Sequence, residues 1–295
     1  MRRRAKCRRE RNPQIAWRLA LLRVALRRPS ERSDFPAGGC VRQAMRSSLR
    51  PKVIAVTCLA FEARIAAATA SVNILCSARS NSLARLIETA IAQDCGGIIS
   101  FGVAGGLDPR LRPGDWVVAS QVVTNSTRYP TDASWSRRIC DALPSPGHGS
   151  ISGVDEPIAR PADKARLHEL HGSLAADTES HVAARMAAAR GIPFAAARVV
   201  LDPAHRALPP AALLPLCPDG SPDLRAIARS VRIAPGQIRA LSRLAVEAIC
   251  AQSALLLGTR CLGESLGFEG CQTLEPAGSE GELALTDGEL PARSA

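Results

Sequence analysis

The fold is decided by residues 52–104, KVIAVTCLAFEARIAAATASVNILCSARSNSLARLIETAIAQDCGGIISFGVA. Three short runs rich in Val, Ile and Leu alternate with two runs of helical spacing, and in the second of these the apolar positions 83, 86, 87 and 91 share one face. Strands are predicted at 52–59, 71–78 and 96–104, and helices at 61–70 and 82–94. A β-α-β-α-β order in under sixty residues predicts a largely parallel sheet that helices cover on both faces.

The same alternation continues toward the carboxyl end. Further strands are predicted at 114–123 and 193–204, the second ending at Asp202, with Trp116 in the first as a core residue. The stretch 173–191 reads as a strand end followed by an Ala-rich helix that Gly191 closes. A loop-rich stretch with prolines at 130, 144 and 146 is predicted after the strand that ends at residue 123, and helices are expected at 223–230 and 235–257. The fold class is therefore α/β, a three-layer αβα sandwich around a mostly parallel or mixed sheet.

Composition divides the chain into three parts. Residues 1–50 hold 15 of the 38 basic and 3 of the 27 acidic residues, a net charge of +12, whereas the other 245 hold 23 basic and 24 acidic. This leader could form a basic amphipathic helix at a membrane surface, or be untranslated if Met45 is the true start, and we favour the second. The folded domain is expected at 51–263, and the acidic tail 264–295 is predicted to be disordered.

Several function classes are disfavoured by the same residues. The domain after residue 50 is not basic, so the sequence predicts no nucleic-acid partner. The ten cysteines are scattered without a C-x-x-C pair and suit a reducing cytosol. His168 and His171 are three residues apart but no third ligand follows, so no metal is predicted. Arg18 and Arg23 interrupt the apolar run of the leader, so that segment is not expected to span a membrane.

Three acids and a glycine-rich loop fall where a parallel sheet binds ligands, at the carboxyl ends of its strands. Glu62 follows the first strand, Glu179 begins the Ala-rich helix, and Asp202 follows an apolar strand and precedes a proline. Glu179 taken alone reads more simply as a helix-start acid, as does Asp177 two residues before it. The loop FGVAGGLDP places Gly102, Gly105 and Gly106 where backbone can approach a ligand closely.

Together these blocks resemble a known family. VTCLAFEAR, ISFGVAGGLDPRLRPGDWVVA, GVDEPIARPADK and AADTESHVAARMAAARGIPFAAARVVLD follow in order the pattern of the purine nucleoside phosphorylase and methylthioadenosine/S-adenosylhomocysteine nucleosidase superfamily. With DPAHRALPPAAL added, they look most like the hopanoid-associated phosphorylase branch, which is thought to act on adenosylhopane. The resemblance implies a nucleoside phosphorylase or N-ribosyl hydrolase of the corresponding αβα fold.

The resemblance also implies roles for individual residues. Asp202 would protonate the departing purine, and Glu62 would orient or activate the nucleophile. Glu179 would accept hydrogen bonds from the ribose hydroxyls, with Thr178 beside it. The loop from Gly102 to Gly106, Val103 included, would contact the sugar and the nucleophile, and Asp155 would lie near the base.

This chain departs from the family pattern at several of these positions. Val103 stands where a serine is usual, Thr178 where a methionine is usual, and Pro157 where an aromatic residue stacks on adenine. Cys58 replaces a common glycine, while Arg79 in the second loop could attract phosphate. The sequence leaves hydrolysis and phosphorolysis open, with phosphate as a possible co-substrate and no cofactor.

Three functions are carried forward. The first is release of adenine from adenosylhopane in hopanoid biosynthesis by a cytoplasmic homo-oligomer that contacts the inner membrane peripherally. The second is cleavage of methylthioadenosine or S-adenosylhomocysteine, which a small closed pocket would favour. The third is a non-catalytic nucleoside-binding or membrane-associated protein, which has no need of the proton donor that Asp202 supplies.

Overall fold

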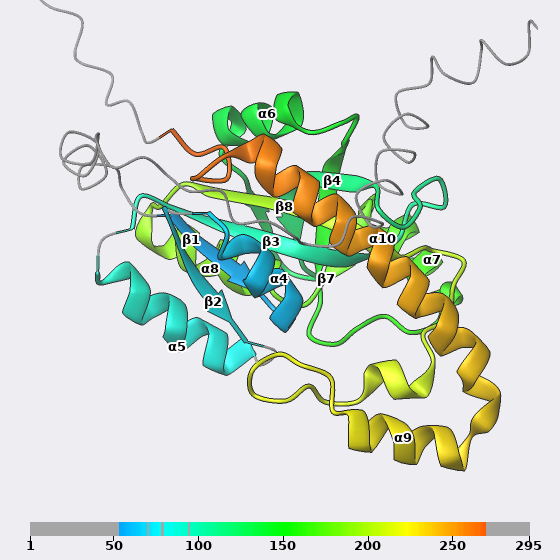
Figure 1. Ribbon diagram of the computed structural model, residues 1–295. Coiled ribbons are helices and arrows are strands. Elements are labelled where there is room, and N and C mark those ends of the chain that lie inside the picture. Colours follow the sequence, from blue (N-terminus) through cyan, green and yellow to red (C-terminus); the bar gives the residue numbers. More distant parts are fainter. Residues whose placement is uncertain (1–52, 70, 78–79, 94, 270–295) are drawn as a thin grey trace, which may run out of the picture.

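Figure 1 shows the computed structural model of the protein. It describes residues 53–69, 71–77, 80–93 and 95–269. The basic leader, including Met45, lies outside the described residues, as do Arg79 and the tail from residue 270. Predictions that concern these parts therefore stay predictions.

The centre of the molecule is a mixed sheet of eight strands. The strands are β1 (Val53–Thr57), β2 (Val72–Cys76), β3 (Gly97–Gly106), β4 (Trp116–Val123), β5 (Arg128–Pro130), β6 (Gly147–Gly153), β7 (Ala175–Asp177) and β8 (Phe194–Asp202). Their order is β2-β1-β3-β7-β6-β4-β5, and β8 pairs with both β3 and β4. The pairs β1–β2, β1–β3 and β3–β8 are parallel, whereas β3–β7 and β4–β8 are antiparallel. The predicted mixed sheet is confirmed.

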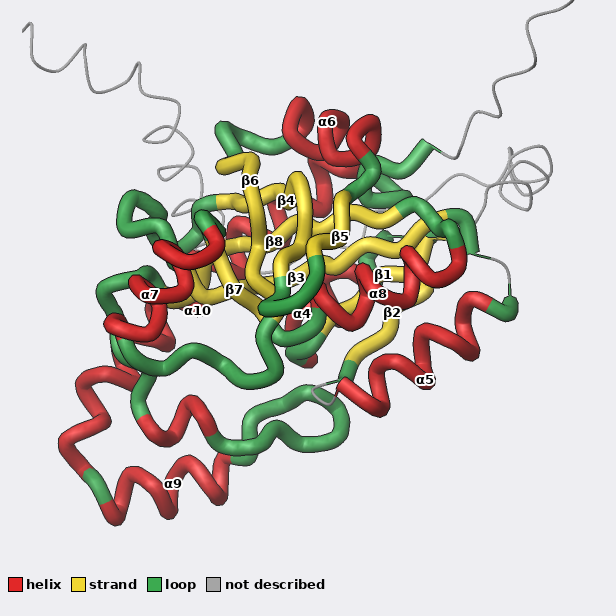
Figure 2. Tube along the Cα trace, turned by 180° about the vertical axis from the view of Figure 1, so that it is seen from behind, coloured by secondary structure: helices red, strands yellow, loops and turns green. Residues whose placement is uncertain are grey.

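Helices cover both faces of this sheet, as Figures 1 and 2 show from opposite sides. The α-helices are α4 (Ala60–Ala66), α5 (Ser80–Ile91), α6 (Ala133–Ala142), α7 (Pro161–His171), α8 (Ser180–Arg190), α9 (Leu224–Ile233) and α10 (Ile238–Leu262), with 3-10 turns at Pro210–Leu213 and Pro235–Gln237. Side chains of α4, α6 and α10 share one hydrophobic core with the sheet, and those of α5 and α8 share the other. The three-layer αβα prediction is confirmed.

Small residues set how closely the helices approach. Trp116 is buried and its ring lies 5.8 Å from that of Phe101, which confirms its predicted place in the core. A Cβ atom on Gly258 of α10 would lie 2.2 Å from the Trp116 ring, so only glycine lets α10 cross there. At the end of α8, Gly191 has a φ of 62° and ends the helix as predicted.

The predicted loop-rich stretch around Pro130, Pro144 and Pro146 is wrong, because β5, α6 and β6 lie there. Strand β6, GHGSISG, has little apolar content of its own and buries Ile151 because β4 and β7 pair on either side of it. Helix α6 begins at a recognisable signal, since the Asp132 carboxylate accepts from the Trp135 backbone N–H at 2.7 Å. Helix α7 was not predicted either.

The folded part continues beyond residue 263, where the sequence had placed the end of the domain. Leu266 and Phe268 are both buried. The Trp135 indole N–H donates to the Leu266 carbonyl at 2.9 Å, and its ring lies 4.7 Å from that of Phe268. This short segment after α10 therefore closes the core over α6.

Candidate active site

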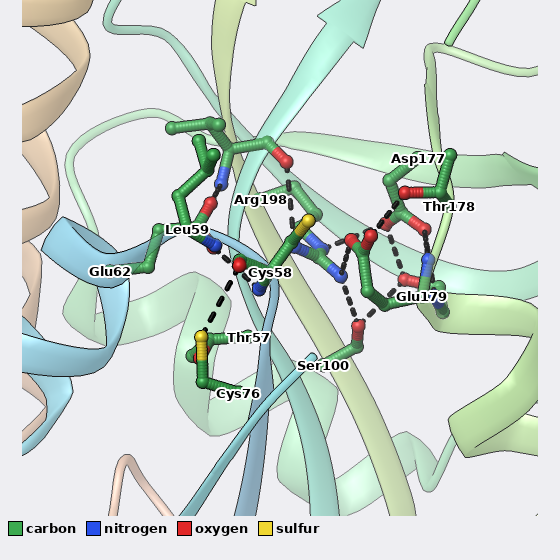
Figure 3. A network of polar contacts seen from close by, with 12 residues as sticks. Thr57, Cys58, Leu59, Glu62, Cys76, Ser100, Asp177, Thr178, Glu179 and Arg198 are labelled. Carbon is green, nitrogen blue, oxygen red and sulfur yellow. Dashed lines mark hydrogen bonds and ion pairs between the residues drawn. The ribbon is translucent and has the colours of Figure 1, made fainter. Parts of the chain in front are cut away.

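One edge of the sheet carries the three acids that the sequence singled out, and Figure 3 shows two of them, Glu62 and Glu179, around Arg198. Because β1, β3 and β8 run parallel, their carboxyl ends meet at this edge. Glu62 follows β1 in the first turn of α4, and Asp202 ends β8. Glu179 joins them because the end of β3 pairs with β7, at Gly105 with Ala176 and at Gly106 with Ala175. The topology thus places Glu62 and Glu179 in one cluster around Arg198 and Asp202 beside Gly105 at the same edge of the sheet.

Glu62 is buried and its carboxylate is held by backbone N–H groups. Its Oε1 accepts from Val103 N at 2.6 Å, and its Oε2 accepts from Cys58 N and Leu59 N at 2.8 Å each. Burial raises the pKa of Glu62, while the nearby Arg198 guanidinium and these N–H groups oppose the rise. The carboxylate occupies a cradle of backbone donors that would otherwise suit an anion.

Gly102 is required by this arrangement. Its φ is +152°, and a Cβ atom there would lie 2.4 Å from Glu62 Oε1 and 2.9 Å from a nitrogen of Arg198. The predicted close approach at this glycine is therefore an approach to the protein's own acid. Farther along β3, a Cβ on Gly105 would lie 3.5 Å from both carboxylate oxygens of Asp202, and one on Gly106 would meet Val200 at 3.1 Å.

Arg198 is the centre of the site, and sequence reasoning missed it. The guanidinium is fully buried, with Nε 2.7 Å from Asp177 Oδ2 and one terminal nitrogen 3.2 Å from Glu179 Oε2. The same nitrogen donates to Ser100 Oγ at 2.5 Å, and the other donates to the Val103 carbonyl at 3.4 Å. An arginine inside the apolar run AAARVVL was the available signal, because a buried arginine requires charged partners.

Asp177 has the helix-entry role that the sequence predicted. Its Oδ1 accepts from the backbone N–H groups of Glu179 at 3.1 Å and Ser180 at 2.7 Å, where α8 begins. Its other oxygen binds Arg198. Asp177 therefore fixes both the start of α8 and the guanidinium that faces Glu179.

Glu179 is buried beside two other acids. Burial raises its pKa to about 7, Arg198 opposes the rise, and the charges of Asp177 and Glu62 add to it. The Thr178 hydroxyl donates to Glu179 Oε1, which lowers the pKa. Cys58 lies against this group, and burial together with the Glu179 charge raises the pKa of its thiol.

Asp202 is paired with a lysine that sequence reasoning also missed. Lys164 of α7 is buried, and its ammonium donates to Asp202 Oδ2, to the Pro203 carbonyl at 3.1 Å and to the Arg206 carbonyl at 3.2 Å. Burial raises the pKa of Asp202, and the Lys164 charge lowers it. A lysine on a helix is usually exposed to solvent, so nothing in the sequence indicated that Lys164 is buried beside Asp202.

The remaining predicted residues lie outside this cluster or outside the residues that the structure describes. The Asp155 side chain is 91% exposed, and its carboxylate lies 3.4 Å from His181 Nε2. Arg79, the predicted phosphate contact, lies outside the described residues. His168 and His171 bind different partners, the Ser173 carbonyl at 2.7 Å and the Ser152 hydroxyl at 3.0 Å. Within the described ranges, no three His, Cys, Asp or Glu residues are grouped to hold a metal ion.

The arrangement suits a reaction that builds positive charge. Glu62, Asp177 and Glu179 surround the single guanidinium of Arg198, so the ionised cluster carries an excess of negative charge. A ribosyl oxocarbenium ion formed beside Glu179 would be stabilised by that excess. Asp202 lies beside Gly105 and forms a buried pair with Lys164 that is able to hold a proton.

Comparison with known proteins identifies the family and the fold. Residues 67–214, half of the chain, match the profile of the Phosphorylase superfamily. The native futalosine hydrolase of Helicobacter pylori is 14% identical with a TM-score of 0.51, over 70% of this chain and 95% of that one. A Helicobacter pylori MTAN mutant with 5′-methylthioadenosine in the active site is 14% identical with a TM-score of 0.50, over 71% and 97%. A search of curated proteins found no match. The chain belongs to the phosphorylase superfamily and is homologous to nucleosidases and phosphorylases, enzymes that cleave N-glycosidic bonds.

Proposed function

We propose that the protein cleaves the N-glycosidic bond of an adenine nucleoside, and that its substrate is adenosylhopane in hopanoid biosynthesis. The observation that carries the proposal is the buried cluster of Glu62, Glu179 and Arg198, with the Asp202–Lys164 pair across Gly105. A binding protein has no need of a buried proton-holding pair, which speaks against the non-catalytic alternative. The family-like sequence blocks of the domain support the hopanoid branch.

Each group has a defined part in the proposed reaction. The Glu179 carboxylate accepts hydrogen bonds from the ribose hydroxyls and stabilises the positive charge of the sugar. As the glycosidic bond breaks, a proton passes from the Asp202–Lys164 pair to a ring nitrogen of the departing base, and the pair regains it from water. Glu62 orients the nucleophile, and Arg198 holds Glu179 in place.

Water is the nucleophile that the described site favours over phosphate. The backbone N–H groups of Cys58, Leu59 and Val103, which could bind an anion, already donate to the Glu62 carboxylate. A phosphate dianion there would also meet the negative charge of Glu62 and Glu179. Since the product of hydrolysis is a free ribose, we propose ribosylhopane rather than a phosphorylated sugar.

The function is tested by incubating the purified protein with adenosylhopane or with methylthioadenosine, each with and without phosphate, and measuring adenine release. We expect adenine from adenosylhopane at a rate that phosphate does not change. Faster release from methylthioadenosine would support the nucleosidase alternative, which the fold shared with the MTAN structure also favours. Folded protein that releases adenine from neither substrate would contradict the enzymatic proposal.

The pKa of Glu179 gives the reaction a pH dependence. We expect kcat/KM to rise with pH on the acidic side as Glu179, with a pKa of about 7, loses its proton and can accept two ribose hydrogen bonds. Glu179→Gln should remove this rise and lower kcat/KM at pH 8 at least about tenfold. Thr178→Val is the matched variant: it removes a hydrogen bond that lowers the pKa of Glu179, so the rise should move to higher pH. An unchanged acidic rise in Glu179→Gln would show that another group titrates.

The Lys164 charge should control the other side of the pH profile. Lys164 lowers the pKa of Asp202, so Lys164→Met should raise it. On the basic side of the profile, the decline of kcat with pH reports the loss of the proton that Asp202 gives to the base. We expect this decline to be displaced to higher pH in Lys164→Met and restored in Lys164→Arg. Thermal denaturation checks that the variants fold; a decline that stays in place in folded Lys164→Met would separate Lys164 from the reaction.

A further inference from the structure

The helices α9 and α10 meet at a corner that lies away from the sheet in Figures 1 and 2, and we call residues 224–250 the α9–α10 corner. Large apolar side chains are exposed there: Leu224 by 74%, Ile233 by 78%, Ile238 by 51%, Val246 by 61% and Ile249 by 55%. Helix α9 buries none of its residues. In α10, positions 238, 245 and 249 share one face. Both helices of the corner therefore carry exposed apolar side chains that the described part of the chain does not cover.

Basic side chains flank this apolar surface. Five arginines of the corner are exposed: Arg225, Arg229, Arg232, Arg239 and Arg243. The two acids near them are engaged elsewhere, since Asp223 accepts from the first N–H groups of α9 and Glu247 lies 3.2 Å from Arg206. Exposed apolar residues beside unopposed arginines are the pattern of a helix that lies in the headgroup region of an anionic membrane.

Residues 235–262 are long and apolar enough by composition to cross a membrane, but only part of α10 is free to meet lipid. Its second half is packed in the core, where Leu255 is fully buried and Gly258 crosses Trp116. Only the first half presents its apolar face to solvent. A second copy of the chain is a poorer occupant than an anionic lipid surface, because Asp223 and Glu247 are already engaged and would leave the arginines of both copies without acidic partners.

The corner is connected to the active-site edge by a short stretch of chain. The Gly220 carbonyl accepts from the Ala60 N–H at 3.0 Å at the start of α4, four residues before α9 begins. A Cβ on Gly220 would lie 2.5 Å from the Cys58 carbonyl, so this loop lies against the segment that binds Glu62. The chain therefore leads from the active-site edge directly into α9, the first helix of the corner.

We propose that the α9–α10 corner docks the protein on an anionic lipid bilayer. The surface itself does not depend on the reaction, whereas its use in presenting a lipid-linked substrate rests on the proposed function. Arginine side chains would bind lipid phosphates while Ile233 and Ile238 enter the acyl boundary.

The test is flotation of the full-length protein with phosphatidylcholine vesicles containing 30% phosphatidylglycerol, against vesicles of phosphatidylcholine alone. We expect binding to the anionic vesicles that weakens at high salt. Ile233→Glu with Ile238→Glu should lower the bound fraction at least tenfold, and replacing Arg225, Arg229 and Arg232 by glutamine should weaken binding about fivefold for each arginine. The matched controls are Leu170→Glu, an exposed apolar residue of α7, and Arg85→Gln with Arg137→Gln.

The outcomes distinguish vesicle binding through the corner from binding through other parts of the protein. Equal binding by the corner variants and the controls would overturn the proposal, since the basic leader is present in all of them. A dimer in the absence of lipid that only the corner variants dissociate would assign the surface to a second copy and also overturn it. Adenine release from water-soluble methylthioadenosine, if the protein has that activity, should be unchanged in the corner variants. Because vesicle binding is measured without catalysis, a failure of the membrane proposal can be told apart from a failure of the proposed enzymatic function.

Discussion

Asp202→Asn is expected to lower kcat for adenine release by about 10²–10⁴-fold, the usual contribution of a positioned general acid. Asparagine keeps the shape of the side chain and can still accept from Lys164, but it has no proton to give. Because Asp202 is proposed to act in bond breaking and not in holding the ribose, substrate affinity should change far less than kcat. Single-turnover rates and equilibrium binding of the nucleoside measure the two effects separately.

The matched control for this variant is Asp163→Asn on the same helix as Lys164. Asp163 pairs with Arg160 at the surface, and its carboxylate has no contact with the site acids. We expect it to leave kcat unchanged. Asp202→Asn leaves the Lys164 ammonium buried beside a neutral partner, so its folding must be checked by thermal denaturation. If folded Asp202→Asn protein turns over at the wild-type rate, another group protonates the base.

The second large effect is expected on stability. Arg198→Met should lower the free energy of unfolding at pH 8 by about 3–5 kcal/mol, because it leaves buried acids without their shared counter-charge. The loss should be smaller at pH 5. Burial already raises the pKa values of Glu62 and Glu179, and Arg198 lowers both. Without it these acids take up protons at still higher pH.

The sign of this pH dependence follows from the raised pKa values. An acid whose pKa is higher in the folded than in the unfolded protein contributes its full stability below the unfolded pKa of about 4.3. That contribution is lost as the pH rises through the folded pKa. Denaturant unfolding at pH 5 and pH 8 therefore checks the prediction. Arg190→Met, which breaks a surface pair with Glu88, is the control and should cost under about 1 kcal/mol. If Arg198→Met lowers the free energy of unfolding equally at both pH values, the predicted pH dependence is contradicted.

Much of the fold followed from hydrophobic periodicity. The strands and helices of residues 53–91 and the strand ending at Asp202 are where apolar spacing predicted them. Strand β6 could not be predicted in this way, because its glycines and serines have no strand-like pattern and its pairing comes from distant neighbours. Helix α7 presents mostly polar residues yet is anchored by one buried lysine.

The sequence predicted those residues of the site that directly follow a strand. Glu62, Glu179 and Asp202 follow strands, so a rule about sheet edges found them. The side chains that hold these acids were missed, since Arg198 lies within a strand and Lys164 on a helix separated by 38 positions from its partner. Such pairings depend on tertiary contacts and leave no local spacing to read.

The segment after α10 has a practical meaning for handling the protein. Leu266 and Phe268 complete the apolar surroundings of Trp135, so a recombinant chain shortened at Gly263 would remove two core residues and expose an indole ring. Purification tags and fluorescent labels on the carboxyl side therefore belong after Glu269. The same indole is a natural reporter, because its emission should shift to longer wavelength when that segment detaches from the core.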